Sequence, residues 1–256
     1  MKLALIGDPV SHSRSPQLQN AFLREADLEG SYVAVRVQKG QAVETVRRMW
    51  TDGYTGVNVT SPLKEEVLAA CDELDEEAAM AKAVNTIIFG RKITGANTDG
   101  VGARTAMEAV MGNAVALERV GILGTGATAR AILAQLRETD AYTFIWGRDS
   151  GKVADLCERF EAQSWPSNPP EFVISTLPPA VELPHRLVAD LQRADTVMDV
   201  NYGERSTLAK ASGREVVGGD VMFEAQARAS FNLWLSCAQA ARASLRRGGD
   251  SNSRDL

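Results

Sequence analysis

The sequence predicts an α/β fold built from two domains. Short β-type runs alternate along the chain with amphipathic, helix-like stretches, and this alternation is typical of α/β architecture. The runs form two successive series, and each series begins with a strand-like run that leads into a glycine turn, at residues 3–6 and 119–123. The length of 256 residues is large for one compact core and comfortable for two smaller ones.

The predicted elements follow in order along the chain. β-Branched and aromatic residues bounded by turn residues predict the strands. The strands are 3–6, 32–37, 56–60, 86–89 and 93–96 in the first series, and 119–123, 142–146, 172–175, 197–200 and 216–217 in the second. The predicted helices between them are 16–26, 42–50, 62–71, 102–111, 127–137 and 152–160.

We place the domain boundary at residue 98, close to the start of the second series. Residues 1–98 are the predicted first domain, and residues 99–220 the second. A long helix over 221–245 is expected to return to the first domain and complete it, which would leave a ligand cleft between two lobes. The polar and glycine-rich residues 246–256 are expected to be disordered.

Composition narrows the class of protein. The net charge of -5 gives no electrostatic reason to expect nucleic acid or an anionic membrane as a partner, and no apolar run approaches the roughly 20 residues of a membrane helix. Three cysteines without metal-type spacing and only two histidines predict no metal site and a reducing compartment. We therefore expect a cytoplasmic protein, a monomer or homodimer, that acts on a small molecule.

A glycine-rich segment opens the second series. Gly124-Thr125-Gly126-Ala127-Thr128-Ala129 follows a predicted strand, precedes a predicted helix and fits the fingerprint G-x-G-x-x-G/A. In that fingerprint Gly124 makes the tight turn, Gly126 permits close backbone approach, and Ala129 packs the helix on the strand. The helix start offers N–H groups to a pyrophosphate. The segment predicts a dinucleotide site of the Rossmann type.

The next predicted strand ends in Gly147-Arg148-Asp149, where the fingerprint expects its specificity residue. Arg148 would pair with a 2′-phosphate through its planar fork, and Lys152 would add charge, which favours NADP. Asp149 has two interpretations: it is the acid that an NAD enzyme uses for the ribose hydroxyl, or it is the N-cap of the following helix.

Two polar clusters follow strand-like runs and indicate proton transfer. Lys64 ends the run Asn58-Val59-Thr60-Ser61-Pro62-Leu63-Lys64, and Asp99 lies in Asn97-Thr98-Asp99-Gly100. A lysine and an aspartate brought together at strand ends make a proton-transfer pair. Beside a dinucleotide site, such a pair predicts an oxidoreductase. On their own, Lys64 would be a solvated residue of a first helical turn and Asp99 a turn or N-cap residue.

The segment from Gly7 to Pro16 follows the first predicted strand and carries two serines. The hydroxyls of Ser13 and Ser15 project the same way if the segment is extended. The alternative is that Ser15 is an N-cap, with Pro16 at the first helical position.

Taken together, these segments resemble the shikimate dehydrogenase family. The family's Gly-x-Pro-x-x-His-Ser-x-Ser-Pro loop corresponds to residues 7–16, and its Asn-Val-Thr-x-Pro-x-Lys run to residues 58–64. Ala-Val-Asn-Thr corresponds to 83–86, Asn-Thr-Asp to 97–99, and a late Gly-x-x-Met-x-x-x-Gln-Ala pattern to 219–227. The matches run in order over about residues 3–240. Departures are Gly147-Arg148-Asp149 for Asn-Arg-Thr, and Ala127 for a second loop glycine.

The resemblance implies a role for each matched position. It implies that Ser13 and Ser15 bind the substrate carboxylate, with Tyr202 near it, and that Lys64 and Asp99 are the catalytic pair. The residues implied to hold ring hydroxyls are Asn58, Thr60, Asn85 and Gln226. The residues assigned to the cofactor are Gly124, Gly126, Ala127, Arg148, Lys152, Gly219 and Met222.

The implied reaction is the NADPH-dependent, reversible reduction of 3-dehydroshikimate to shikimate, a step of chorismate and aromatic amino acid biosynthesis. Hydride addition to a ketone builds negative charge on its oxygen, which Lys64 would meet with charge and a proton. Asn, Gln and Thr side chains suit a hydroxyl-rich ring because they donate and accept hydrogen bonds. Two alternatives stay open: a dehydrogenase of quinate or amino-shikimate, and a non-catalytic sensor of such a metabolite.

Overall fold

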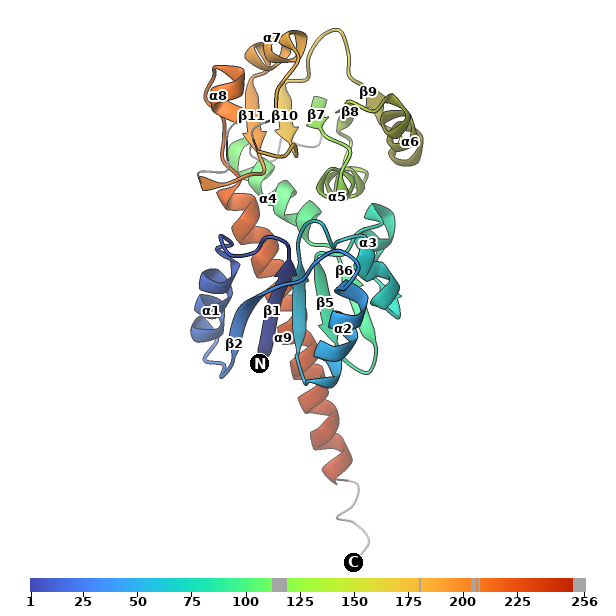
Figure 1. Cartoon of the computed structure of the whole chain (residues 1–256), viewed down its shortest axis with the longest axis vertical. Helices are drawn as coiled ribbons and strands as arrows, with labels where there is room; N and C mark the ends of the chain where they lie inside the picture. The colour runs from blue at the N-terminus through green and yellow to red at the C-terminus, as the bar shows by residue number, and fades with distance from the viewer. Residues whose placement is uncertain (112–118, 180, 204–205, 207, 251–256) are drawn as a thin grey trace, which may run out of the picture. The chain divides into compact units, whose positions relative to one another are not determined.

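The computed structural model describes residues 1–111, 119–179, 181–203, 206 and 208–250 (Figure 1). The chain divides into two compact units. The first unit consists of Met1–Asp75, Val84–Ala96 and Ala227–Leu256, and the second of Glu76–Ala83 and Asn97–Gln226.

The first unit contains a sheet of six strands in the order β2-β1-β3-β5-β6-β4. Strand β1 is parallel to β2 and β3, whereas β5 is antiparallel to β3 and β6. The strands are β1 (Lys2–Gly7), β2 (Ser31–Arg36), β3 (Gly56–Val59), β4 (Glu73–Leu74), β5 (Thr86–Phe89) and β6 (Ile93–Ala96).

Helices pack on this sheet and form the core of the first unit. They are α1 (Ser15–Glu25), which lies along β2 in Figure 1, α2 (Ala42–Thr51), and the part of α9 (Asp220–Asp250) that begins at Ala227. Trp234 of α9 is fully buried, and its indole N–H donates a hydrogen bond of 2.9 Å to the carbonyl of Ile87. A Cβ on Gly56 would lie 2.0 Å from the Trp234 indole nitrogen. Glycine at position 56 therefore lets the helix approach the sheet.

The helix predicted over 62–71 is wrong in extent. The structure has only a 3₁₀ segment, η1 (Glu66–Ala70). The carbonyl of Lys64 would accept from the N–H of Leu68 in an α-helix, but it accepts instead from the N–H of Val84 at 2.8 Å. The N–H of Val67 does donate to the carbonyl of Leu63 at 3.1 Å, but the bond from Val84 takes the place of the next helical bond, so the turn does not continue as an α-helix.

The second unit contains a parallel sheet of five strands in the order β11-β10-β7-β8-β9. The strands are β7 (Arg119–Leu123), β8 (Tyr142–Trp146), β9 (Gln163–Ser164), β10 (Phe172–Ser175) and β11 (Thr196–Asp199). The helices are α3 (Glu76–Ala81), α4 (Asp99–Met111), α5 (Ala127–Leu136), α6 (Ser150–Phe160), α7 (His185–Arg193), α8 (Leu208–Ser212) and the first turns of α9. Strands that alternate with crossover helices confirm the predicted α/β class.

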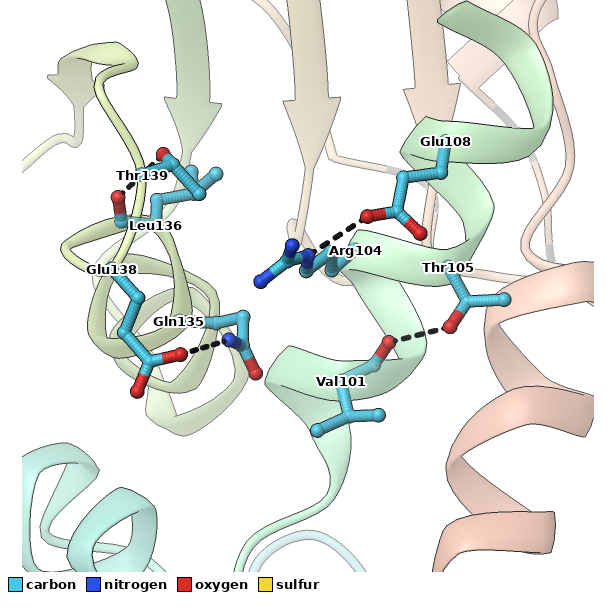
Figure 2. A network of polar contacts seen from close by, with 8 residues as sticks. All are labelled: Val101, Arg104, Thr105, Glu108, Gln135, Leu136, Glu138 and Thr139. Carbon is cyan, nitrogen blue, oxygen red and sulfur yellow. Dashed lines mark hydrogen bonds and ion pairs between the residues drawn. The ribbon is translucent and has the colours of Figure 1, made fainter. Parts of the chain in front are cut away.

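Helices α4 and α5 approach each other closely. A Cβ on Gly100 would lie 2.6 Å from the carbonyl oxygen of Ala131 and 2.9 Å from the Cβ of Gln135. The polar contacts drawn in Figure 2 each stay within one segment: Arg104 pairs with Glu108 at 2.8 Å along α4, and Gln135 donates to Glu138 at 2.9 Å. None of these drawn contacts joins α4 to α5. The two helices meet where Gly100 lets their backbones come close.

Several short elements have no counterpart among the predicted ones. They are β4, α3, β9, α7 and α8. Strands β4 and β9 have two residues each and exist through pairing with β6 and β8, which leaves no periodic signal in the sequence. The strand predicted at 216–217 is an isolated bridge between Met198 and Val217. Helix α9 continues to Asp250, five residues into the predicted disordered tail, and 251–256 lie outside the described residues.

Candidate functional site

Six of the predicted site residues lie on strand β3 or in the segments joined to the same ends of β1, β3 and β5. Strands β1 and β3 are parallel, in a register that pairs Ile6 with Val59, so both end at the same edge. Strand β5 runs antiparallel to β3 and begins at that edge, where Thr86 pairs with Asn58. The predicted residues on or beside these strand ends are Ser13, Ser15, Asn58, Thr60, Lys64 and Asn85.

The loops that follow β1 and β3 are held against each other. The N–H of Thr60 donates to the carbonyl of Ile6 at 2.9 Å, and the N–H of Asp8 donates to the carbonyl of Ser61 at 3.3 Å. A Cβ on Gly7 would lie 2.3 Å from the Thr60 methyl group. Glycine at position 7 therefore leaves room for the Thr60 side chain, and the start of the serine loop lies beside Thr60.

The two serines lie together, as the sequence predicts, but in a turn rather than an extended segment. The Ser13 hydroxyl donates to the Ser15 hydroxyl at 3.1 Å, and it also accepts from the Ser15 N–H at 3.2 Å. Ser15 is the first residue of α1, and Arg14 occupies the cap position. The N-cap alternative for Ser15 is therefore wrong. The bond from the Ser15 N–H holds the Ser13 side chain just before the helix, where the two hydroxyls are in hydrogen-bonding contact.

Asn58 lies in a buried polar network, and its exposed fraction is 7%. Its Oδ1 accepts from the hydroxyl of Tyr32 at 2.8 Å, and its Nδ2 donates to the Ser230 hydroxyl at 3.0 Å. Nδ2 also lies 3.1 Å from the carbonyl of Asn85 and 3.2 Å from the hydroxyl of Thr86. Both ends of the Asn58 amide are engaged by protein, so the side chain has a structural role at this edge. Its contact with a ring hydroxyl stays a prediction.

The same network orients Asn85. The Thr86 hydroxyl donates to Oδ1 of Asn85 at 2.8 Å and lies 2.7 Å from the hydroxyl of Ser230. Because its Oδ1 accepts this bond, the Asn85 amide is held in one orientation. Sequence reasoning missed Tyr32, Thr86 and Ser230, and the adjacency of Thr86 to Asn85 in the chain was the one available signal.

Lys64 lies in the loop between β3 and η1, and its side chain is half-buried. Its main chain is fixed by the bond from Val84. The predicted alternative, a solvated residue in the first turn of a helix, is wrong because η1 begins at Glu66.

The dinucleotide loop of the second unit has the geometry that the fingerprint requires. Gly124 has φ +115°, and an added Cβ would lie 2.4 Å from the Thr176 hydroxyl, so this position needs glycine. Gly126 caps α5, and an added Cβ there would meet no atom within 4 Å. Ala129 is fully buried in the core of the unit. The space beside Gly126 and the N–H groups at the start of α5 fit a pyrophosphate.

Arg130 ties this loop to α3. Its Nε donates to the carbonyl of Ala81 at 2.6 Å and its Nη1 to the carbonyl of Thr125 at 3.4 Å. A second guanidinium, that of Arg159, donates to the carbonyl of Met80. Burial, and then repulsion from Arg130, lower the pKa of Arg159. The main-chain carbonyls of Met80 and Ala81, at the end of α3, accept hydrogen bonds from these two guanidinium groups and so reduce the repulsion between their charges.

The residues after β8 divide between two roles. The Asp149 carboxylate accepts from the N–H groups of Gly151 at 3.0 Å and Lys152 at 3.1 Å, which confirms that Asp149 is the N-cap of α6. Arg148 and Lys152 are exposed, and their side chains make no hydrogen bond or ion pair within the described part of the chain. Both cations are therefore available for a phosphate.

Asp99 is the first residue of α4 and is 5% exposed. Its N–H donates to Oδ1 of Asn97 at 3.0 Å, and Nδ2 of Asn97 donates to the carbonyl of Ala83 at 2.8 Å. Its Oδ2 accepts from the hydroxyl of Thr128 at 3.1 Å. Lys64 belongs to the first unit and Asp99 to the second, so their pairing stays a prediction.

The remaining predicted residues lie in the second unit. The ring of Tyr202 packs on that of Phe223, with 4.4 Å between the centroids. Gln226 is half-buried, and its Nε2 donates to the carbonyl of Phe223 at 2.9 Å. Met222 is buried in the core, and a Cβ on Gly219 would lie 2.3 Å from the carbonyl oxygen of Val200. Close packing is sufficient to explain methionine at position 222 and glycine at position 219. Contact of either residue with a cofactor stays a prediction.

The loop that carries Tyr202 is held by a buried carboxylate that the sequence analysis missed. Oδ1 of Asp199 accepts from the N–H of Asn201 at 3.0 Å and from its side-chain amide at 2.8 Å, and Oδ2 accepts from the Ser206 hydroxyl at 3.0 Å. Asp199 is 2% exposed. These bonds fix the chain on both sides of Tyr202.

Within the described residues, no group of three or more His, Cys, Asp or Glu side chains is placed to hold a metal ion. None of the helices in that part of the chain has the length and apolar character that crossing a membrane requires. The thiols of Cys71, Cys157 and Cys237, all of which lie in the described part, are free.

Known proteins resemble this chain over most of its length. A family model described as the shikimate dehydrogenase substrate binding domain matches residues 5–87. The shikimate dehydrogenase (NADP(+)) of Bacillus licheniformis is 31% identical over 249 residues and covers 90% of each chain. The enzyme of the same name from Methanosarcina barkeri is 32% identical, over 90% of this chain and 91% of its own.

Solved structures agree in fold. Shikimate 5-dehydrogenase from Thermus thermophilus, in complex with NADP(H) and shikimate, has a TM-score of 0.81 at 27% identity and covers 95% of this chain and 99% of its own. Shikimate dehydrogenase from Aquifex aeolicus also has a TM-score of 0.81, at 28% identity over 93% of both chains.

Proposed function

This chain belongs to the shikimate dehydrogenase family, and on that premise we propose that it catalyses the NADPH-dependent, reversible reduction of 3-dehydroshikimate to shikimate. The observation that carries the proposal is the collection of Ser13, Ser15, Asn58, Thr60, Lys64 and Asn85 at one edge of the first sheet. Hydroxyl and amide groups, together with an ammonium, are the types of group that suit a hydroxyl-rich ring with a carboxylate and a ketone.

The two units would divide the ligands between them. We assign residues 1–98 and the returning helix to the substrate, and residues 99–220 to NADP. Gly124, Gly126 and Ala127 would approach the pyrophosphate, and Arg148 with Lys152 would pair with the 2′-phosphate. Asp149 as a helix cap supports NADP over NAD, because the cap already engages this carboxylate.

NADPH, when bound, supplies the hydride that reduces the ketone carbon. The ketone oxygen gains negative charge as that bond forms, and we assign Lys64 to stabilise this charge and donate the proton. Asp99 would hold the charge of the ammonium and accept from an adjacent ring hydroxyl. In the reverse direction Lys64 would take the proton from the ring hydroxyl. Ser13 and Ser15 would donate to the substrate carboxylate, and Tyr202 would lie near it.

The remaining assignments are that Asn58, Thr60, Asn85 and Gln226 bind ring hydroxyls and that Gly219 and Met222 lie at the cofactor.

We further propose a cytoplasmic location, supported by the odd number of free cysteines, and a monomer or homodimer.

A comparison of substrates and cofactors tests the proposal. Purified protein is given shikimate or quinate with NADP or NAD, and the absorbance of the reduced nicotinamide at 340 nm is followed. The highest kcat/KM is expected for shikimate with NADP. Equal or better turnover of quinate with NAD would identify a quinate enzyme. Shikimate binding in calorimetry with no change in absorbance would identify a sensor.

A further inference from the structure

Thr128 links the dinucleotide loop to Asp99. Its hydroxyl donates a hydrogen bond of 3.1 Å to Oδ2 of the Asp99 carboxylate. Thr128 is half-buried in the first turn of α5, and Asp99 is buried at the start of α4. Both belong to the second unit, and 29 positions of the chain separate them. The bond therefore joins the starts of two helices, one at the cofactor loop and one at the aspartate of the proposed catalytic pair.

Other contacts fix the backbone around Asp99. Its N–H donates to Asn97, and the Thr98 hydroxyl donates to the carbonyl of Gln226 at 3.0 Å. Gly100 lies against the backbone of Ala131, so α4 begins in contact with α5. These contacts place the Cα of Asp99, but rotation about the side-chain bonds still changes the direction of the carboxylate. The bond from Thr128 acts on the carboxylate itself.

A threonine hydroxyl in a helix can instead donate to the main-chain carbonyl three or four residues before it. Thr105 of α4 shows that use, since its hydroxyl donates to the Val101 carbonyl at 3.0 Å (Figure 2). The Thr128 hydroxyl has one proton to donate, and it donates to a carboxylate, which makes the bond stronger than one to a neutral acceptor. A carboxylate accepts about four hydrogen bonds, so this contact is compatible with further partners of Asp99.

We propose that Thr128 is a positioning residue, whose hydroxyl holds the Asp99 carboxylate in the orientation used for proton transfer and thereby couples that carboxylate to the dinucleotide loop. The inference rests on the proposed function and adds to it a residue outside the proposed catalytic pair.

The test replaces Thr128 by valine, which has the same shape without the hydroxyl, and by serine, which keeps the hydroxyl. In the oxidation of shikimate with NADP, kcat of Thr128→Val is expected to fall about tenfold, as for the loss of one hydrogen bond to a charged group. The KM for NADP should stay within about twofold of wild type, since no bond to the nucleotide is removed.

Serine at position 128 should restore most of kcat. Thr105→Val is the matched control, since it removes a threonine hydroxyl from α4 and should leave kcat at the wild-type value. Thr128→Ala replaces the valine variant if the latter does not fold, as judged by thermal unfolding.

Wild-type kcat in Thr128→Val would overturn the inference, as would equal losses in the serine and valine variants or a change confined to the KM for NADP. Any of these results would overturn the role of Thr128 but not the proposed function, provided that the wild-type protein oxidises shikimate with NADP. Wild-type protein without NADP-dependent oxidation of shikimate would overturn the proposed function, and the inference with it.

Discussion

The hydroxyl of Tyr32 donates a hydrogen bond of 2.8 Å to Oδ1 of Asn58, and both side chains are buried. Tyr32 lies in the edge strand β2, whereas Asn58 lies two strands away in the sheet order. The bond orients the Asn58 amide so that its Nδ2 faces Ser230 and Thr86. The predicted substrate residue Asn58 is thus held by buried hydrogen bonds, and two of its partners, Tyr32 and Ser230, lie outside the motifs named above.

Tyr32→Phe should lower the free energy of unfolding by about 1–3 kcal/mol, because it leaves a buried acceptor on Asn58 without this donor. Urea unfolding followed by circular dichroism measures the change. Tyr142→Phe is the control, since Tyr142 is 62% exposed, and it should change stability by less than about 0.5 kcal/mol. Equal stability of Tyr32→Phe and wild type would contradict the structural role of this bond.

Lys64→Ala should lower kcat by about 10²–10⁴-fold, the contribution of a group that transfers a proton in the transition state. The KM for shikimate should change far less. Steady-state kinetics at saturating NADP separate the two constants. Lys39→Ala, which removes an exposed lysine of the same unit, should leave both unchanged. An effect confined to KM would make Lys64 a binding residue only.

Gly124 and Gly126 should respond differently to alanine. Gly124→Ala places a side chain at φ +115° and against Thr176, so it should destabilise the second unit by about 1–3 kcal/mol or more. Gly126→Ala meets no protein atom within 4 Å and should fold normally. It should nevertheless weaken NADP binding about tenfold, because its methyl group would occupy the space beside the pyrophosphate. Calorimetric titration with NADP measures this, and unchanged affinity would place the nucleotide elsewhere.

Arg148 and Asp149 are adjacent and should have separable effects. Arg148→Ala should raise the KM for NADP much more than the KM for NAD, since only NADP has the 2′-phosphate. Asp149→Ala removes the cap of α6 and should lower the free energy of unfolding by about 0.5–2 kcal/mol. Steady-state kinetics with NADP and NAD, together with urea unfolding, are measured for both variants and test whether the two effects are separate. A parallel rise in both KM values for Arg148→Ala would argue against a phosphate contact.

Cys71 should react slowly with thiol reagents. Burial, and then the charge of Asp72, raise the pKa of its thiol to about 11, so about one thiol in a thousand is ionised at pH 8. In a variant with Cys157→Ser and Cys237→Ser, the rate of alkylation by iodoacetamide should rise about tenfold per pH unit from 8 to 10. The same variant in urea should react at the rate of an ordinary thiol. Rapid alkylation of the folded protein at pH 8 would contradict the raised pKa.

Local signals explain which predictions the structure bears out. Strands such as β1 and β7 and the glycine turn at Gly124 are set by residue type over a few positions, and the structure confirms them. The helix predicted over 62–71 is wrong because a distant residue, Val84, takes the carbonyl of Lys64. The strands β4 and β9 exist through pairing alone. Periodicity carries no information about such partners.

The sequence by itself determined the α/β class, the dinucleotide loop and the motif residues, from Ser13 to Gln226, because each depends on the identity and spacing of neighbouring residues. Only the tertiary structure decided how those residues are held. Asn58 meets Ser230, 172 positions away, and Asp99 meets Thr128, 29 positions away. The physical reason is that a hydrogen bond needs two groups within about 3 Å, and folding, rather than chain order, brings such groups together.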